Sequence, residues 1–206
     1  FAYRYRSGEV VVNDRSGFID DLDELPMPAW DLIDFKDYEM DLSHYYNPKG
    51  LKMKNQIPIF TSRACPYACT FCDMYIVMGR KLRQRSPSRV VDELEYLNRE
   101  RGMDYFSFMD DNFTAQKEHV LEICDEILKR KLNIQFDTPN GLNVNSLTEE
   151  IVAAMVKAGL VSTSLAIEHG NDYIRNTVIK KKLPRKKIYE VAALFKKYKV
   201  LTGGFF

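Results

Sequence analysis

The sequence has 206 residues, of which 45% are hydrophobic, and its 30 basic and 29 acidic side chains give a net charge of +1. A chain of this length and hydrophobic content folds around a real core rather than staying disordered. The near-neutral charge creates no overall field toward nucleic acid or an anionic membrane. No apolar run approaches the ~18 residues of a membrane span, and no secretory signal opens the chain, so we expect a cytoplasmic protein without a membrane partner.

Residues 1–55 differ in composition from the rest of the chain. They contain the run Val10-Val11-Val12 and an acidic stretch from Asp20 to Asp41, which Pro26 and Pro28 interrupt. Proline lacks a backbone donor and disfavours helix at the residue before it. We therefore predict a short hairpin and an extended linker over 1–55, followed by a core domain over 56–206. The sequence stops inside a predicted strand, so we expect the C-terminal strands to be truncated.

From residue 57 onward, short apolar runs alternate with longer stretches of helical period. This pattern predicts an α/β fold of repeated β-α units around a parallel sheet. Right-handed crossovers between successive strands curl such a sheet toward a partial barrel, and a doubly wound open sheet is the alternative. In both folds the functional groups lie on loops after the C-terminal strand ends. Strands are predicted at 57–61, 105–109, 133–136, 161–167 and 200–206, and helices at 86–97, 120–128, 147–157 and 188–195.

Three of the four cysteines, Cys65, Cys69 and Cys72, form a Cys-x3-Cys-x2-Cys motif directly after the first of these strands. Thiolates are soft ligands suited to iron-sulfur clusters and zinc, and a structural zinc site needs four closed ligands. Because four cysteines normally hold a 4Fe-4S cluster, three leave one iron with an open position for a small molecule. A zinc knuckle completed by Asp73 or a distant histidine is the alternative. Cys124 lies on the apolar face of a predicted helix and is expected in the core.

The segment from Arg63 to Cys72 resembles the radical S-adenosylmethionine (SAM) superfamily. In that family the open iron binds SAM, and an electron from the 4Fe-4S cluster cleaves the sulfonium to a 5'-deoxyadenosyl radical. Phe71 matches the family's aromatic before the third cysteine, where the loop backbone contacts adenine. The resemblance implies a TIM-like (β/α)6 barrel, a small-molecule substrate, and an electron donor such as flavodoxin or ferredoxin.

Polar groups after the later strands are candidates to hold SAM. Asp110 and Asp111 occupy the position that in the family is often Gly-Gly-Glu and meets the SAM amino group, and the choice between them stays open. Helix capping by Asn112 or Thr114 is the alternative reading of this segment. Asn140 is a weaker candidate.

The segment Ile167-Glu168-His169-Gly170 resembles the family's Gly-Ile-Glu-Ser-Gly, with Ala166 and His169 as departures. The resemblance makes Glu168 a candidate ligand of the SAM ribose. An ionised glutamate after a buried strand is costly unless paired, which favours a ligand role. We expect His169 to be solvated, and contact with substrate beside the ribose site is the alternative. The basic run Lys180-Lys181-Lys182 and the cations at 185–187 predict a solvated turn rather than a nucleic-acid site.

The linker from Asp21 to Asp31 resembles the connector that follows the cobalamin-binding domain in cobalamin-dependent radical SAM proteins. A plain acidic linker that packs Trp30 and Leu25 onto the barrel is the alternative. Cobalamin and methyl transfer are thus expected from the resemblance, although the cobalamin domain would lie before Phe1. Two alternatives remain: a cobalamin-independent radical SAM enzyme, either a methylthiotransferase or a porphyrinogen-oxidising type, and a non-catalytic zinc module. Residues 1–64 lack the second cysteine triplet of a methylthiotransferase.

Overall fold

The computed structural model describes residues 2–14, 17–38 and 56–206. Within them, five parallel strands form one sheet in the order β3-β6-β7-β8-β9, so that neighbours in the sheet are also consecutive strands of the core. A doubly wound sheet would reverse its strand order, and this one does not. The partial barrel is therefore the correct alternative. The strands are β3 (Ile57–Ile59), β6 (Tyr105–Phe108), β7 (Gln135–Leu142), β8 (Leu160–Ala166) and β9 (Leu201–Phe205).

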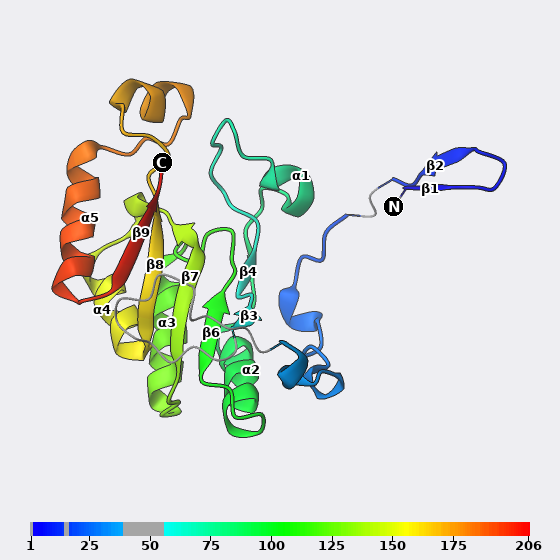
Figure 1. Cartoon of the computed structure of the whole chain (residues 1–206), viewed down its shortest axis with the longest axis horizontal. Helices are drawn as coiled ribbons and strands as arrows, with labels where there is room; N and C mark the ends of the chain where they lie inside the picture. Colours follow the sequence, from blue (N-terminus) through cyan, green and yellow to red (C-terminus); the bar gives the residue numbers. More distant parts are fainter. Residues whose placement is uncertain (1, 15–16, 39–55) are drawn as a thin grey trace.

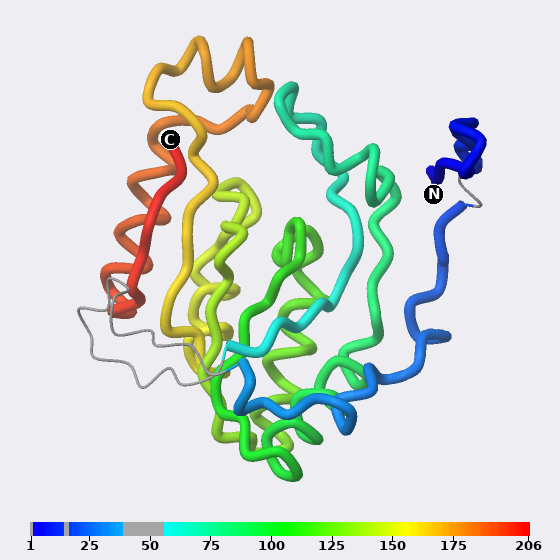
Figure 2. Tube along the Cα trace, turned by 45° about the vertical axis from the view of Figure 1, so that its right-hand side comes forward, coloured from blue at the N-terminus to red at the C-terminus, as the bar shows by residue number. Residues whose placement is uncertain are grey.

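Each pair of successive strands is joined through a helix, as the apolar periodicity predicts. Figure 1 shows these helices on one side of the sheet, and Figure 2 shows how the sheet curves away from them. Phe106, Phe108 and Phe136 are buried in the single core cluster that the sheet shares with the helices. This packing leaves the concave face and the carboxyl ends of the strands for function. The helices are α2 (Pro87–Arg99), α3 (Lys117–Lys129), α4 (Glu149–Ala158) and α5 (Arg185–Lys197).

Helix ends follow the sequence signals with one difference. Gly159 ends α4 at φ +119°, where an added Cβ would lie 2.3 Å from the carbonyl oxygen of Ile134, so only glycine fits. Ser86 is the N-cap of α2 and Pro87 its first residue, as predicted, but the Ser86 side chain makes no capping hydrogen bond. Its backbone N–H instead donates to Asp23 Oδ1 of the linker at 2.9 Å.

Strand β7 differs from the prediction. It was expected to end at Phe136, yet it runs to Leu142 through two irregularities in its pairing with β8. Beyond Asp137 it pairs with β8 and no longer with β6, so Pro139 removes no needed donor. The predicted loop at 137–141 is therefore the second half of a strand.

The N-terminal part contains the predicted hairpin, in which β1 (Ala2–Arg4) pairs antiparallel with β2 (Val10–Val12). The linker that follows has three short 3-10 turns, at Leu22–Glu24, Trp30–Leu32 and Phe35–Tyr38, rather than a fully extended course. None of the described helices is long and apolar enough to cross a membrane.

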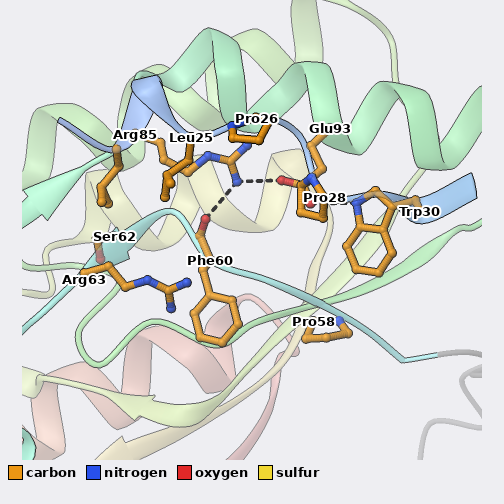
Figure 3. A pocket seen from close by; sticks show the side chains of 11 residues that line it. Leu25, Pro26, Pro28, Trp30, Pro58, Phe60, Ser62, Arg63, Arg85 and Glu93 are labelled. Carbon is orange, nitrogen blue, oxygen red and sulfur yellow. Dashed lines mark hydrogen bonds and ion pairs between the residues drawn. The ribbon is translucent and has the colours of Figure 1, made fainter. Parts of the chain in front are cut away.

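The linker packs against α2 and the end of β3, as Figure 3 shows. Trp30 Nε1 donates to Glu93 Oε1 at 2.9 Å, and Arg85 forms an ion pair with the other oxygen of Glu93 at 2.5 Å. Arg85 also donates to the carbonyl oxygen of Phe60 at 3.0 Å. These contacts surround a pocket of about 230 Å³ on the linker side of β3. Trp30 thus packs on the core, which both readings of the linker require, whereas Leu25 remains 40% exposed.

Candidate functional site

The three clustered cysteines lie on a loop that is closed at its base by a small sheet. Strand β4 (Ser62–Arg63) pairs antiparallel with β5 (Arg83–Gln84), and the loop between them carries the one-turn helix α1 (Met74–Met78). Cys65, Cys69 and Cys72 are half-buried and line the same pocket, whose volume is about 370 Å³. The loop therefore brings three thiols together at the carboxyl end of the sheet.

The start of this loop has a strained backbone. Ala64 is fully buried and has φ +74°, a left-handed conformation that residues other than glycine rarely adopt. Its N–H donates to Asp111 Oδ2 at 3.2 Å. Such strain persists only where surrounding contacts enforce it, and it concentrates at functional sites. Here it sets the direction of Cys65, the next residue.

Burial raises the pKa of two thiols of the loop, and different neighbours partly offset the effect at each. Burial raises the pKa of Cys65, with hydrogen bonds from the Tyr67 backbone and Asn112 acting in the opposite direction. Burial also raises the pKa of Cys69, which the positive charge of Lys181 partly offsets. Because the thiolate is the metal-binding form, a bound cation would be needed to stabilise it here.

The two aspartates after β6 have separate surroundings. Asp110 is 2% exposed and accepts hydrogen bonds from Thr61 N–H at 3.1 Å, Thr61 Oγ1 at 2.8 Å and Ser62 Oγ at 2.5 Å. It fixes the end of β3 and does not line the pocket. Asp111 is half-buried and does line it. Of the two, only Asp111 faces the space where a ligand would bind.

Glu168 follows β8 and lies at the pocket with φ +73°. Its Oε1 is 2.7 Å from the Nζ of Lys181, which is only 8% exposed. The prediction that Lys180-Lys181-Lys182 is a solvated turn is therefore wrong for Lys181, because its carboxylate partner compensates for its burial. The ion pair with Lys181 also offsets the free-energy cost of burying an ionised glutamate at this position.

The loop that carries this ion pair is held by a buried arginine. Arg175, fully buried, donates through Nε to the carbonyl oxygen of Leu183 at 2.9 Å and through Nη1 to that of His169 at 2.8 Å, and it pairs with Asp172. It lies in a π-helical turn, Ile174–Val178, a feature frequent at functional sites. His169 turns its Nδ1 to the N–H of Asn171 rather than to the pocket.

Two further predicted residues line the pocket. Asn140 does so while its Nδ2 donates to the carbonyl oxygen of Met109 at 2.9 Å. Phe71 is 61% exposed at the pocket edge. All the predicted site residues except Asp110 thus line one pocket. Figure 2 shows the cysteine loop and the loop after β8 at the same end of the sheet.

Sequence reasoning missed Lys181 and Asn112. Lys181 was hidden in a run of cations of which the other members are exposed or half-exposed, so no spacing signal set it apart. Asn112 was considered only as a helix cap. Neither Asn112 nor Thr114 caps α3, whose N-cap is Gln116. Asn112 instead lines the pocket, while Thr114 Oγ1 bonds Ser146 Oγ at 2.6 Å.

Cys124 does not belong to this site. It is 1% exposed within the core cluster on α3, as predicted, and burial raises its pKa to about 12. Within the part of the chain that the structure describes, no three Cys, His, Asp or Glu side chains converge closely enough to hold a single metal ion. Four-coordinate zinc would need its ligands within about 2.0 to 2.3 Å of one point.

The model of the Radical SAM superfamily matches residues 59–205, which include the whole sheet from Ile59 onward and all the site residues described above. The chain belongs to the radical SAM superfamily. It is 30% identical over 186 residues to the cytidylyl-2-hydroxyethylphosphonate methyltransferase of Streptomyces wedmorensis, covering 90% of this chain and 34% of that protein. It is also 30% identical over 167 residues to the anaerobic magnesium-protoporphyrin IX monomethyl ester cyclase of Rubrivivax gelatinosus, covering 81% of this chain and 28% of the cyclase.

Solved structures share the radical SAM fold. OxsB, a cobalamin-dependent SAM radical enzyme whose structure holds aqua-cobalamin and SAM, aligns with 98% of this chain and 28% of its own at a TM-score of 0.71 and 19% identity. TsrM from Kitasatospora setae, a radical SAM methyltransferase solved with cobalamin and a 4Fe-4S cluster, aligns with 78% of this chain and 32% of its own at 0.65 and 18%. The chain spans about a third of the length of the proteins it matches.

Proposed function

We propose that this chain holds a 4Fe-4S cluster on Cys65, Cys69 and Cys72 and binds SAM beside it for reductive cleavage to a 5'-deoxyadenosyl radical. The observation that carries the proposal is that three thiols from one loop line the same pocket as Asp111 and Glu168. When bound, a cluster held by three thiolates supplies an electron and one iron with an open coordination position. The protein's part is to bind, orient and shield.

The donor set of the pocket fits this pair of cofactors. Three soft thiols that line one pocket suit an iron-sulfur cluster, in which one iron stays open for SAM. SAM presents a carboxylate, an ammonium and ribose hydroxyls. The pocket offers a cation for the carboxylate and oxygen acceptors for the ammonium and the hydroxyls. Lys181 provides the positive charge, while Asp111, Asn140 and Glu168 provide oxygen acceptors. Phe71, at the pocket edge, is in place for its loop backbone to meet the adenine.

For the whole protein we propose a cobalamin-dependent methyltransferase that acts on a small molecule. Support comes from the methyltransferases among the relatives, from the cobalamin in the matching structures and from the linker at 21–31. The similarity to the cyclase of Rubrivivax gelatinosus favours a second candidate, ring formation on a tetrapyrrole-type substrate. An Asp-x-His-x-x-Gly cobalamin motif upstream of residue 1 in the full-length gene product would support the role of cobalamin.

The reaction consumes an electron, which must come from outside the chain. We expect a low-potential protein donor such as flavodoxin or ferredoxin. The described residues offer no second cysteine triplet that would store the electron near the site.

The proposal is tested by anaerobic reconstitution with iron and sulfide. We expect about four irons per chain with the broad absorbance near ~400 nm of a 4Fe-4S cluster, because three thiolates share one loop. Alanine at Cys65, Cys69 or Cys72 should abolish iron binding. The matched control, Cys124→Ala, should keep the iron and cost about 1 kcal/mol of folding free energy through lost packing. A colourless protein with one tightly bound zinc would refute the proposal.

A further inference from the structure

Asn112 lines the pocket and has a side-chain oxygen without a hydrogen-bond partner among the described residues. The residue is 3% exposed, and its Nδ2 lies 3.8 Å from the Sγ of Cys65, within range of an N–H···S hydrogen bond. Its Oδ1 is buried and has no hydrogen-bond partner among the described residues. Buried polar side-chain atoms are nearly always paired, so the unpaired oxygen of a residue that lines the pocket indicates a missing donor.

The position of the Asn112 side chain is built into the fold. The next residue, Phe113, is buried and stacks on Phe108 of β6 with ring centroids 4.8 Å apart. The carbonyl oxygen of Asn112 accepts the N–H of Ala115 at 3.1 Å. Thr114 is bonded to Ser146 on the other side of the loop. Because the backbone is fixed on both sides, the amide stays between Cys65 and the pocket.

Each end of this amide has a separate chemical consequence. An N–H directed at a cysteine sulfur that ligates a cluster stabilises the more negative, reduced state and raises the reduction potential. The carbonyl oxygen accepts a hydrogen bond from an N–H or O–H group of whatever molecule occupies the pocket. An isosteric apolar side chain would remove both effects while it filled the same volume.

We propose that Asn112 is a positioning residue with two roles, in which its Nδ2–H raises the potential of the Cys65-ligated cluster and its Oδ1 binds a donor group of the pocket ligand. The proposal rests on the function proposed above, since it requires a cluster on Cys65. In this proposal the loop after β6 helps to set the reduction potential of the cluster, in addition to the ligand contact by Asp111.

The test compares anaerobically reconstituted parent, Asn112→Leu and Asn112→Ala protein. The control is Cys124→Ala, because Cys124 is buried in the core and lies outside the pocket. Reduction is followed by electron paramagnetic resonance during a potentiometric titration. Binding of S-adenosylhomocysteine, which lacks the cleavable sulfonium, is measured by calorimetry.

In both Asn112 variants we expect the ratio of reduced to oxidised cluster at a fixed potential to fall about tenfold, which is 59 mV for a one-electron couple. The dissociation constant for S-adenosylhomocysteine should rise about tenfold, since a buried hydrogen bond to the ligand is lost. The potential of Cys124→Ala should equal that of the parent.

Unchanged potentials in both Asn112 variants would overturn the first role, and unchanged affinity would overturn the second. Should Asn112→Leu fail to hold iron, Asn112→Ala, which introduces no bulk, supplies both measurements. Parent protein that takes up no iron would contradict the proposed function itself, an outcome distinct from a parent that holds a cluster which the variants do not alter.

Discussion

Asp110 and Asp111 are adjacent in sequence, yet they have different structural roles. Asp110 ties the end of β3 to the end of β6 through Thr61 and Ser62, whereas Asp111 reaches the cysteine loop and the pocket. Side chains of neighbouring residues in an extended segment point to opposite sides of the backbone, but the sequence does not show which of these sides faces the ligand. The burial of Asp110 and the place of Asp111 in the pocket lining support the proposal that Asp111 is the one that contacts SAM.

The surroundings of Asp110 predict a pH dependence of stability. Burial raises its pKa, an effect that hydrogen bonds from Ser62 and Thr61 partly offset. The folded protein therefore takes up a proton at higher pH than the unfolded chain does. This contribution to stability is fully present below about pH 3.9, the ordinary value for aspartate, and is lost as pH rises through the raised pKa.

Asn at position 110 cannot ionise, so Asp110→Asn should lack this dependence. The difference in unfolding free energy, parent minus Asp110→Asn, should decrease as pH rises from about 4 toward neutrality. Urea unfolding at a series of pH values measures it. A difference that stays constant over this range would contradict the assignment of a raised pKa to Asp110.

Glu168 gives a second prediction at this scale. Glu168→Gln should weaken SAM binding, because a hydrogen bond from a ribose hydroxyl to a charged acceptor contributes roughly 1.5 to 3 kcal/mol. It should leave iron content unchanged. It should also lower stability, because Lys181 would keep a buried charge without its partner.

The double variant Glu168→Gln/Lys181→Met separates the two effects. Removing both charges should restore much of the unfolding free energy, while SAM affinity stays low. Calorimetric binding and thermal unfolding on the same samples measure both quantities. Parent-like SAM affinity in either variant would remove Glu168 from the site.

At the scale of elements, the sequence predicted the strands and helices that carry regular apolar patterns and missed those that do not. The helices α2 to α5 lie close to their predicted positions because their buried faces repeat with helical period. The strands β4 and β5 have two residues each, and they pair because the chain returns to β4 at the end of the cysteine loop. No local sequence pattern indicates strands this short. Strand β7 is longer than predicted because its apolar run ends at Phe136, although the strand continues through the polar residues that follow.

Arg83 lies on the unpredicted strand β5 and contacts two other parts of the chain. It is 7% exposed and donates to the carbonyl oxygens of Met78 at 2.6 Å and Ile19 at 2.8 Å, with its guanidinium over the ring of Phe18. It therefore joins the end of α1 to the linker. An arginine suits this role because its planar group donates in several directions at once.

Arg83→Met keeps the apolar stem and removes the donors, so the cysteine loop should loosen from the linker. We expect faster amide hydrogen exchange at 17–20 and 76–82, with unchanged exchange in α3, and a loss of about 2 kcal/mol in stability. Arg83→Lys, which supplies a single point donor, should give an intermediate effect. Exchange rates equal to those of the parent in both segments would show that the loop is held by other contacts.

At the scale of the whole molecule, the chemistry-bearing residues come from three separate β-α connections. The family resemblance placed the cysteines and Glu168 correctly on loops at one end of the sheet, because parallel strands all point the same way. It gave no account of Lys181 or Asn112, whose roles depend on which side chains lie opposite them. Such contacts are made between loops far apart in sequence, and local spacing carries no record of them.

The strand order has a consequence for how this molecule is made. Because each strand of the sheet pairs with the one that precedes it, the sheet can extend by one β-α unit at a time as the chain is synthesised. The cysteine loop belongs to the first unit, and Glu168 with Lys181 to the fourth. At 5–20 residues per second, roughly ten seconds separate their emergence from the ribosome. During that interval the three thiols lack the cation and the acceptors that later surround them. The growing chain is therefore more open to oxidation, or to binding the wrong metal, than the finished protein.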